Sequence, residues 1–426
     1  MPKLLLSLKQ LIVPQELHLV NLAAYLSCLV GYFLMSQKTG EKKLAMPRVL
    51  YIQYTNPAVY PPLEHSSRIL AQDGWDVLFL GTAAEGTADA LRFPSHPKIT
   101  VQQMPLCLGG WRQKLHYIQF CCGVLAWTFR WQPQWVYASD LLSCPIALLL
   151  SVLGVRLIYH EHDSPTTAHD SFFIRLCLLL RKWLVRRAKM CILPNQERVQ
   201  CFASDLSNSN KVFCVWNCPA QEEVSPPRPP SNGNDLWVLY HGSIVPPRIP
   251  PTVLSALATL PKMVKLRVIG YETLGHRDYV QQLQETACQL GISERVELLT
   301  ALPRKELLEW CKACDIGLAF MPNDSNDINL KHMIGASNKA FDYLACGLAL
   351  VASNLPDWQE MYVEPGYGLA CNPDDPASIA AALRWYLEHP TEMREMGNRG
   401  RQRILTEWNY ETQFKPVKSY MSKALF

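Results

Sequence analysis

The fold is decided by one stretch, Gly335-Ala-Ser-Asn-Lys-Ala-Phe-Asp-Tyr-Leu-Ala-Cys-Gly347, and by the apolar run Leu348-Ala-Leu-Val-Ala352 that follows it. Ser337 and Asn338 are residue types that cap the start of a helix, and a glycine commonly ends one. The pattern therefore predicts a short helix over residues 339–346, and the apolar run predicts a buried strand. A helix that leads directly into a buried strand is typical of α/β proteins.

Lys339 is unusual because it places a positive charge in the first turn of this helix. The helix macrodipole disfavours a cation there by up to about 1 kcal/mol. A helix start with small residues, free backbone N–H groups and a lysine is nevertheless well suited to an anion such as a diphosphate. Asp342, about one turn further along, can then accept hydrogen bonds from a sugar hydroxyl. The alternative is an ordinary helix–strand unit with a solvated lysine.

Length and composition indicate a folded protein of two or three domains. The chain has 426 residues, 49% of them hydrophobic and 18% charged, which excludes a disordered protein. Its net charge of +4 is too small to argue for nucleic acid, and its basic clusters match no nucleic-acid-binding motif. The 15 cysteines stand in apolar contexts and indicate reduced thiols in a cytosolic compartment.

Two cysteine pairs raise the alternative of a zinc site. Cys311 and Cys314 have the spacing of half such a site, and Cys214 with Cys218 could form the other half. The residues before Cys311 follow a helical pattern that leads into an apolar strand. This pattern favours packing of the thiols in the core, so we expect no metal there.

Residues 1–45 form a hydrophobic N-terminal segment. Residues 17–35 contain no Asp, Glu, Lys or Arg and just reach the thickness of a bilayer. More cations follow this stretch than precede it, which favours a cytoplasmic main body that is anchored to or lies on the inner face of the membrane. The alternatives are an amphipathic segment on the membrane or on the domain, and a true start at Met46. A cleaved signal peptide fits the rest of the chain less well.

Strands and helices alternate through two long regions, residues 46–224 and 235–400. This alternation predicts two Rossmann-like, doubly wound α/β domains with parallel sheets that face each other across a cleft. The proline-rich residues 225–234 break both patterns and mark a linker. Residues 391–421 are helical and amphipathic, and we expect the C-terminal helix within residues 401–426 to pack back on the first domain.

The quoted stretch resembles the donor-binding signature of GT-B glycosyltransferases, specifically the retaining family-4 type. The similarity continues in other segments: Leu239–Ile244 with Arg248, Leu266–Gly270, Arg295–Leu299 and Cys314–Ala319. It covers nearly all of residues 46–414 and is strongest in the second region. The resemblance implies the GT-B fold, with a nucleotide-sugar donor bound mainly by the second domain and an acceptor held mainly by the first.

The resemblance also implies roles for residues of the second domain. Asp342 takes the position of the second carboxylate in the family's Glu-x7-Glu motif, which holds the ribose hydroxyls. Arg248 stands where the family places a basic residue on the diphosphate, and Lys339 is a second candidate for that contact. The donor site would be completed by Gly242, Ser243, Gly270, Ser337 and Asn338. One departure is Ile334, which occupies the position of the motif's first carboxylate.

In the first domain, the predicted strand Arg156–Tyr159 runs into the polar residues His160-Glu-His-Asp163. His162 matches the family histidine that faces the donor sugar, and Asp163 either contacts the acceptor or orients that histidine. A metal site is not favoured because successive residues of an extended segment point to opposite sides, and the chain has no His-Glu-x-x-His or Asp-x-Asp motif. A structural histidine cluster is the alternative.

A basic, amphipathic helix is predicted at residues 172–188, a pattern typical both of a helix on anionic lipid and of a solvated helix. We interpret the whole chain as a retaining, metal-independent glycosyltransferase. Its donor is a nucleotide-diphosphate sugar, and its acceptor is a saccharide, lipid-linked or cell-envelope molecule. The alternatives are a nucleotide-sugar epimerase of the same fold and a non-catalytic nucleotide-sugar-binding protein.

Overall fold

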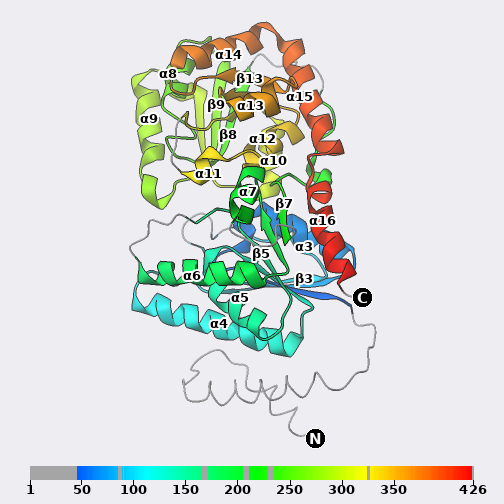
Figure 1. The fold of residues 1–426 in the computed structure, drawn as a ribbon. Coiled ribbons are helices and arrows are strands. Elements are labelled where there is room, and N and C mark those ends of the chain that lie inside the picture. Colours follow the sequence, from blue (N-terminus) through cyan, green and yellow to red (C-terminus); the bar gives the residue numbers. More distant parts are fainter. Residues whose placement is uncertain are drawn as a thin grey trace, which may run out of the picture.

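The structure is a computed structural model, and it describes residues 46–84, 89, 91–165, 171–204, 211–228, 235–323 and 327–424. Two α/β domains stack on each other, and the C-terminal helices run down one side of both (Figure 1). The predicted hydrophobic segment, residues 1–45, lies outside the described residues, as do residues 229–234 of the predicted linker. None of the described helices is both long and apolar enough to span a bilayer.

The N-terminal domain is built on a sheet of seven parallel strands. In spatial order they are β3 (Ile99–Met104), β2 (Asp76–Thr82), β1 (Arg48–Ile52), β4 (Trp135–Ser139), β5 (Leu157–His160), β6 (Met190–Leu193) and β7 (Val212–Cys214). One face is covered by α4 (Trp111–Trp131), α5 (Cys144–Val152) and α6 (Phe172–Arg187). The other is covered by α3 (Pro61–Gln72) and α16 (Tyr410–Lys423). Because both faces are covered, the central strands are apolar along their length.

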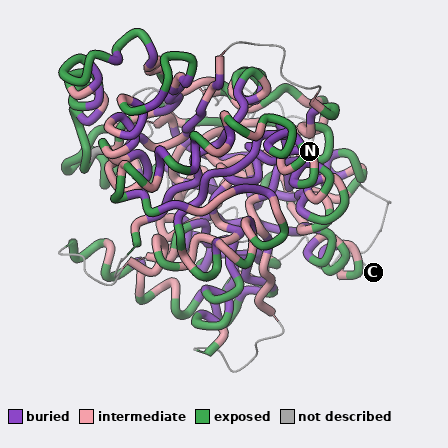
Figure 2. Tube along the Cα trace, turned by 90° about the horizontal axis from the view of Figure 1, so that it is seen from above, coloured by how far each residue is buried: buried purple, intermediate pink, exposed green. Residues whose placement is uncertain are grey.

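The C-terminal domain contains a second sheet, of six parallel strands. In spatial order they are β10 (Val296–Thr300), β9 (Val264–Tyr271), β8 (Leu236–Ser243), β11 (Ile316–Ala319), β12 (Ala349–Ser353) and β13 (Gly368–Cys371). One face carries α8 (Thr252–Ala258), α9 (Tyr279–Gln289) and α14 (Pro376–Glu388), and the other carries α10 (Arg304–Lys312), α12 (Asn338–Ala345) and the end of α15 (Pro390–Thr406). Figure 2 shows the strands buried between exposed helices. The prediction of two parallel sheets is therefore confirmed.

In each sheet the strand order reverses once, between β1 and β4 and between β8 and β11. An open parallel sheet leaves a crevice at such a point, beyond the carboxyl ends of its strands. The fold thus provides one natural binding crevice in each domain.

The stretch that decided the fold forms the predicted helix and strand, each shifted by about one residue. α12 begins at Asn338 and ends at Ala345, and Gly347 follows it with a φ of +72°, a conformation that a side chain would strain. β12 then runs between β11 and β13 and is completely buried. Alternate residues of this run pack into the cores on the two opposite faces of the sheet, which explains why it is continuously apolar.

The C-terminal tail differs from the prediction of a helical run over residues 391–421. The chain leaves the helix after Thr406 and starts α16 at Tyr410, and the side chain of Asn409 caps the new helix by accepting the N–H of Thr412 at 2.9 Å. The break lets α15 pack on the C-terminal domain and α16 on α3 and β7 of the N-terminal domain. Five shorter elements were not predicted: α7 (Gln196–Ser204), β7, α11 (Ile328–Lys331), α13 (Pro356–Trp358) and β13.

Candidate active site

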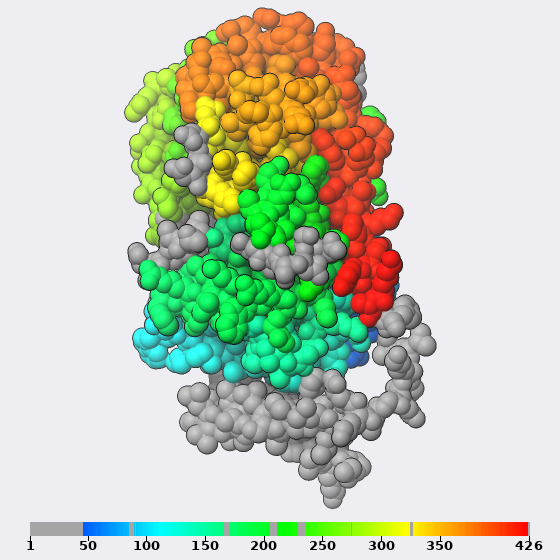
Figure 3. Space-filling view, viewed as in Figure 1, coloured from blue at the N-terminus to red at the C-terminus, as the bar shows by residue number. Residues whose placement is uncertain are grey.

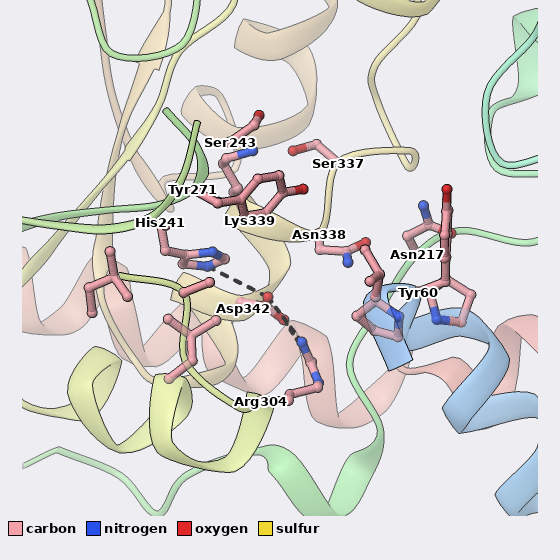
Figure 4. Close-up of a pocket in the computed structure, with 18 of the residues that line it drawn as sticks. Tyr60, Asn217, His241, Ser243, Tyr271, Arg304, Ser337, Asn338, Lys339 and Asp342 are labelled. Carbon is pink, nitrogen blue, oxygen red and sulfur yellow. Dashed lines mark hydrogen bonds and ion pairs between the residues drawn. The ribbon is translucent and has the colours of Figure 1, made fainter. Parts of the chain in front are cut away.

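A cavity of about 340 Å³ lies between the two domains. The C-terminal domain contributes the ends of β8 and β9 and the start of α12, and the N-terminal domain contributes the segment after β1, with Tyr60 (Figure 4). The residues after β5 also line the cavity. The structure brings all the predicted site residues to this cavity: His162, Asp163, Gly242, Ser243, Arg248, Gly270, Ser337, Asn338, Lys339 and Asp342. Their placement is therefore a finding, whereas their roles remain predictions.

Gly242 lets Lys339 lie across the end of β8. The φ of Gly242 is +107°, and a Cβ added there would stand 2.9 Å from Cε and 3.0 Å from Nζ of Lys339. On the neighbouring strand, a Cβ at Gly270 would lie 1.8 Å from the carbonyl oxygen of Gly242. The two glycines thus allow β8, β9 and the lysine to approach one another more closely than side chains would permit.

Two cations face the cavity without a negative partner. Among the residues that the structure describes, the side chains of Arg248 and Lys339 form no hydrogen bond or ion pair, and Nζ of Lys339 lies 5.6 Å from the centre of the Tyr240 ring. Burial lowers the pKa of Arg248. Burial, together with the charge of Arg248, lowers the pKa of Lys339 to about 7. Two desolvated like charges are unfavourable on their own, so their arrangement is suited to an anion.

The start of α12 lacks the side-chain cap that the sequence predicted. Ser337 occupies the N-cap position, but its hydroxyl makes no capping hydrogen bond, and Asn338 is the first helical residue. The Oδ1 atom of Asn338 is buried without a partner. The N-cap position predicted for Ser337 is therefore confirmed, although without a side-chain hydrogen bond, whereas Asn338 lies inside the helix. A helix start without a side-chain cap leaves backbone N–H groups of its first turn for another acceptor.

Asp342 is already held by a residue that the sequence analysis missed. Arg304 donates to Oδ1 of Asp342 at 2.9 Å and to its Oδ2 at 3.3 Å (Figure 4). The same guanidinium donates to Glu223 at 2.9 Å, and Glu223 lies 3.0 Å from Nε2 of His65 on α3. This chain of polar contacts extends from α12 in one domain to α3 in the other.

The balance of burial and charge sets the state of these carboxyl groups. Burial raises the pKa of Asp342, and Arg304 counteracts part of this rise. Burial would also raise the pKa of Glu223, but Arg304 and His65 hold it well below its usual range. His241, whose Nε2 lies 3.6 Å from Oδ2 of Asp342, is kept neutral because burial, Lys339 and Arg304 lower its pKa. Arg304 is thus the charged partner of Asp342, whereas His241 is a neutral neighbour.

His162 presents a neutral imidazole to the cavity. Its ring lies 4.7 Å from the ring of Tyr60 and 3.9 Å from the ring of His160. Neither of its ring nitrogens has a hydrogen-bond partner, and burial lowers its pKa to about 3. Asp163 is exposed beside it and does not hydrogen-bond to the imidazole. An unpartnered, uncharged imidazole is suited to a hydrogen bond with a ligand hydroxyl.

Asp140 supports this histidine and was not predicted. Its Oδ1 accepts the backbone N–H of His162 at 3.1 Å, and its Oδ2 accepts from Gln53 at 3.1 Å. The φ of Asp140 is +61°, a strained conformation for any residue with a side chain. Burial raises the pKa of Asp140 to about 7. Asp140 directly follows β4, and His162 likewise lies just after β5. Because ligands bind beyond the carboxyl ends of parallel strands, the position of Asp140 in the sequence was a signal for a site residue.

The remaining polar residues of this segment have structural partners. Glu161 accepts from Arg181 on α6 at 2.8 Å and from Tyr159 at 2.9 Å, and His160 lies 2.7 Å from the hydroxyl of Tyr137. The alternation of an extended chain thus turns His160 and His162 to one side and Glu161 to the other.

The segment before α12, which contains Ile334 in place of a carboxylate, is fixed by the N-terminal domain. Asn195 donates to the carbonyl oxygen of Ile334 at 2.8 Å. Asn217 donates its backbone N–H to Gly335 at 2.7 Å and its side-chain amide to Ala336 at 2.8 Å. Backbone carbonyls of this segment thus join the two domains directly beside the cavity.

Three of the four cysteines that raised the zinc alternative lie in the core, and Cys214 is half-buried on β7. Cys311 and Cys314 are buried at the end of α10 and just after it, together with Cys218. Within the described ranges, no group of three or more His, Cys, Asp or Glu residues is arranged to hold a metal ion. The expectation of a metal-independent reaction remains a prediction.

Two family models match the chain. A "Glycosyl transferase 4-like domain" matches residues 63–204, and a "Glycosyl transferase-like" model matches residues 251–418. Glycogen synthase of Mycobacterium tuberculosis is 23% identical over 400 residues, which cover 86% of this chain and 92% of that protein. D-inositol 3-phosphate glycosyltransferase of Xylanimonas cellulosilytica is 25% identical over 146 residues, 34% of this chain and 32% of the relative.

Solved structures resemble the whole two-domain arrangement. The Anabaena protein Alr3699/HepE in complex with UDP and glucose has a TM-score of 0.67 at 16% identity, covering 89% of this chain and 100% of that chain. Sucrose-phosphate synthase from Thermosynechococcus elongatus has a TM-score of 0.64 at 14% identity, covering 89% and 99%. At this identity the structures support the fold, and the matched family models support the activity. The chain therefore belongs to the GT-B glycosyltransferases of the group 1, family-4-like type.

Proposed function

We propose that this protein transfers a sugar from a nucleotide-diphosphate donor to an acceptor hydroxyl with retention of the anomeric configuration. The observation that carries the proposal is the pair of unpartnered cations, Arg248 and Lys339, beside the uncapped start of α12. These groups provide the positive charge and the N–H donors that a diphosphate needs. A uridine nucleotide is the first choice, because the similar Anabaena protein is described in complex with UDP and with UDP-glucose.

The proposed reaction uses the donor's own phosphate as the base. The acceptor hydroxyl attacks C1 of the sugar from the face on which the diphosphate leaves. The C1–O bond to the β-phosphate breaks, and the acceptor proton passes to the departing phosphate oxygen. Arg248 and Lys339 stabilise the negative charge that develops there, so we propose that no divalent metal is required. The neutral His162 would hold a hydroxyl of the donor sugar, and Asp342 would accept from the ribose.

The acceptor would enter from the side of the N-terminal domain, where Asp163 is exposed. We propose a saccharide, lipid-linked or cell-envelope acceptor. The fourteen cysteines of the described ranges are free thiols, which fits a cytoplasmic reaction.

A thermal-shift screen of nucleotide sugars tests donor binding. A donor at 100 times its dissociation constant adds about 2.7 kcal/mol of apparent stability. We expect one donor to raise the melting temperature of the wild type and of Lys262→Ala, an exposed lysine in the same domain, but not of Arg248→Ala. The donor that binds is then incubated with candidate acceptors in EDTA.

Release of the nucleoside diphosphate together with a glycosylated acceptor supports the proposal. Conversion of the donor to an isomeric sugar, without glycosylated acceptor, would identify an epimerase. Donor binding without turnover for any acceptor would identify a binding protein, the alternative raised by Ile334. A stabilisation that survives in Arg248→Ala would contradict the proposed site.

A further inference from the structure

The helices α4, α5 and α6 form a continuous outer layer on the N-terminal domain, which we call the α4–α6 face (Figure 1). The ring of Tyr117 on α4 lies 5.0 Å from that of Phe173 on α6. At the other side of the layer, Arg187 of α6 donates to the hydroxyl of Ser151 on α5 at 3.2 Å. These contacts join the three helices into one surface, which is coloured cyan to green in Figure 3.

Exposed apolar side chains concentrate on the α4–α6 face. Seventeen large hydrophobic residues are exposed among the described residues, and ten of them lie on these three helices: Trp111, Leu115, Ile118, Leu149, Val152, Phe172, Phe173, Leu176, Leu179 and Trp183. The largest are well exposed, with 67% for Trp111, 81% for Phe172 and 58% for Trp183. Single exposed hydrophobic residues are normal, but such a cluster indicates an interaction surface.

The same surface is strongly cationic. Exposed arginines and lysines on α4 and α6 include Arg112, Lys114, Arg130, Lys182, Arg186 and Arg187, and none of the three helices contains an aspartate or a glutamate. The whole chain, in contrast, has 41 Lys and Arg against 37 Asp and Glu. The excess of positive charge on this face is therefore local and calls for an anionic partner.

Charge decides between the possible occupants. A second copy of this surface would bring two sets of cations together, with no carboxylate on these helices to pair them. Residues 17–35 of the chain contain no charged side chain, so they could cover apolar side chains but would leave the cations of this face unpaired. A nucleic acid would satisfy the cations but would leave ten large apolar side chains beside phosphates. A bilayer with anionic headgroups matches both features, because its phosphates meet the cations and its acyl boundary receives the apolar side chains.

We propose that the α4–α6 face docks the protein on an anionic lipid bilayer. Glu161, the neighbour of His162 in the cavity, is paired with Arg181 of α6. The docked layer is thus directly joined to the acceptor side of the cavity. If the proposed transfer is correct, the acceptor is presented at the membrane surface as a lipid-linked molecule. This last consequence rests on the proposed function, whereas the docking itself does not.

Flotation of the full-length protein with vesicles tests the docking without donor or turnover. We expect binding to vesicles of phosphatidylcholine with phosphatidylglycerol, weaker binding at high salt, and little binding to phosphatidylcholine alone. Each cation near an anionic surface contributes about fivefold in affinity, the equivalent of about 1 kcal/mol. Lys182→Gln with Arg186→Gln should therefore weaken binding roughly 25-fold. Leu179→Glu with Trp183→Glu should abolish it.

The matched control is Met263→Glu with Leu290→Glu, which changes two exposed apolar residues of the other domain and should bind as the wild type does. Because all these residues are exposed, the melting temperatures should remain unchanged. The proposal is overturned if both α4–α6 variants bind like the wild type, which would leave the binding to residues 1–45 or another surface. It is equally overturned if neutral vesicles bind as well, if the variants only change the oligomeric state, or if single-stranded DNA binds and competes with the vesicles.

Discussion

Lys339, the unusual cation at the start of a helix, also has an unusual pKa in the structure. Its pKa lies at about 7 in the ligand-free protein, against an ordinary value of 10.5. Between these values the unfolded chain holds more protons than the folded one, so this lysine's contribution to stability rises with pH in that window. Below pH 7 the folded protein bears the full cost of the buried charge. The residue thus destabilises the empty site, which is typical of a residue retained for binding.

Donor binding should therefore take up a proton above neutral pH. A diphosphate favours the charged lysine and raises its pKa. Between pH 7 and 9 we expect the affinity for a nucleotide sugar to fall, at most about tenfold per pH unit. Calorimetric titration in buffers of different ionisation enthalpy should show an uptake of close to one proton at pH 8. Lys339→Met should lose this uptake, and an affinity of the wild type that does not change over this range would contradict the assignment.

Arg304 is expected to hold Asp342 in place rather than to touch the sugar. Arg304→Gln leaves two buried carboxyl groups, Asp342 and Glu223, without their common partner. We expect a loss of about 3–5 kcal/mol in the free energy of unfolding, measured by urea denaturation. Adding Asp342→Asn should restore part of the stability but not the donor binding. Full donor binding in the double variant would exclude Asp342 as the ribose ligand.

At this scale the sequence revealed the residues whose type is unusual for their place, and it missed those that depend on long-range pairing. Lys339 stood out because a cation is disfavoured at a helix start. Arg304 is 38 residues from Asp342, and nothing local marks the pair. The capping role expected of Ser337 and Asn338 was a local rule, and the geometry at the cavity overrode it.

The end of β8 is the element on which the site depends most. Gly242→Ala would place a Cβ at a φ of +107° and 2.9 Å from Cε of Lys339. We expect a loss of about 1–3 kcal/mol in stability from the strained backbone, and weaker donor binding because the lysine is displaced. Gly275→Ala is the matched control, since a Cβ there meets nothing within 4 Å. Thermal melting and donor titration of both variants check the prediction, and equal behaviour of the two would refute it.

Elements with a strong pattern were predicted, and short or packing-dependent ones were not. α12 and β12 were predicted to within about one residue, because a closing glycine and a buried apolar run are local signals. β7 and β13 have three and four residues and lie at sheet edges, where apolar alternation is short. The break before α16 depends on the cap formed by Asn409 and on the crossing of the chain from one domain to the other. The helical periodicity of the sequence contains no signal for either.

Hydrogen bonds between the two domains hold them together around the cavity. Arg198 of α7 is completely buried and donates to the carbonyl oxygens of His162, Asn329 and His332, and Ser164 and Asn329 exchange two hydrogen bonds at 2.8 and 2.9 Å. The segment of α11 (Ile328–Lys331) in the C-terminal domain and His162 in the N-terminal domain are therefore positioned relative to each other by these contacts. Alternation of elements predicted both sheets, whereas this alignment depends on contacts between residues far apart in the sequence, which no local pattern contains.

The central claim is that Arg248 and Lys339 together bind the diphosphate of the donor. Calorimetric titration at pH 7 with a nucleoside diphosphate and with the corresponding nucleoside tests it most directly, in the wild type, in Arg248→Gln with Lys339→Met, and in Lys262→Ala. We expect the wild type and Lys262→Ala to prefer the diphosphate by at least about a hundredfold, since a charge-assisted contact contributes about 1.5–3 kcal/mol. The double variant should lose this preference while still binding the nucleoside. A preference for the diphosphate that persists in the double variant would contradict the account.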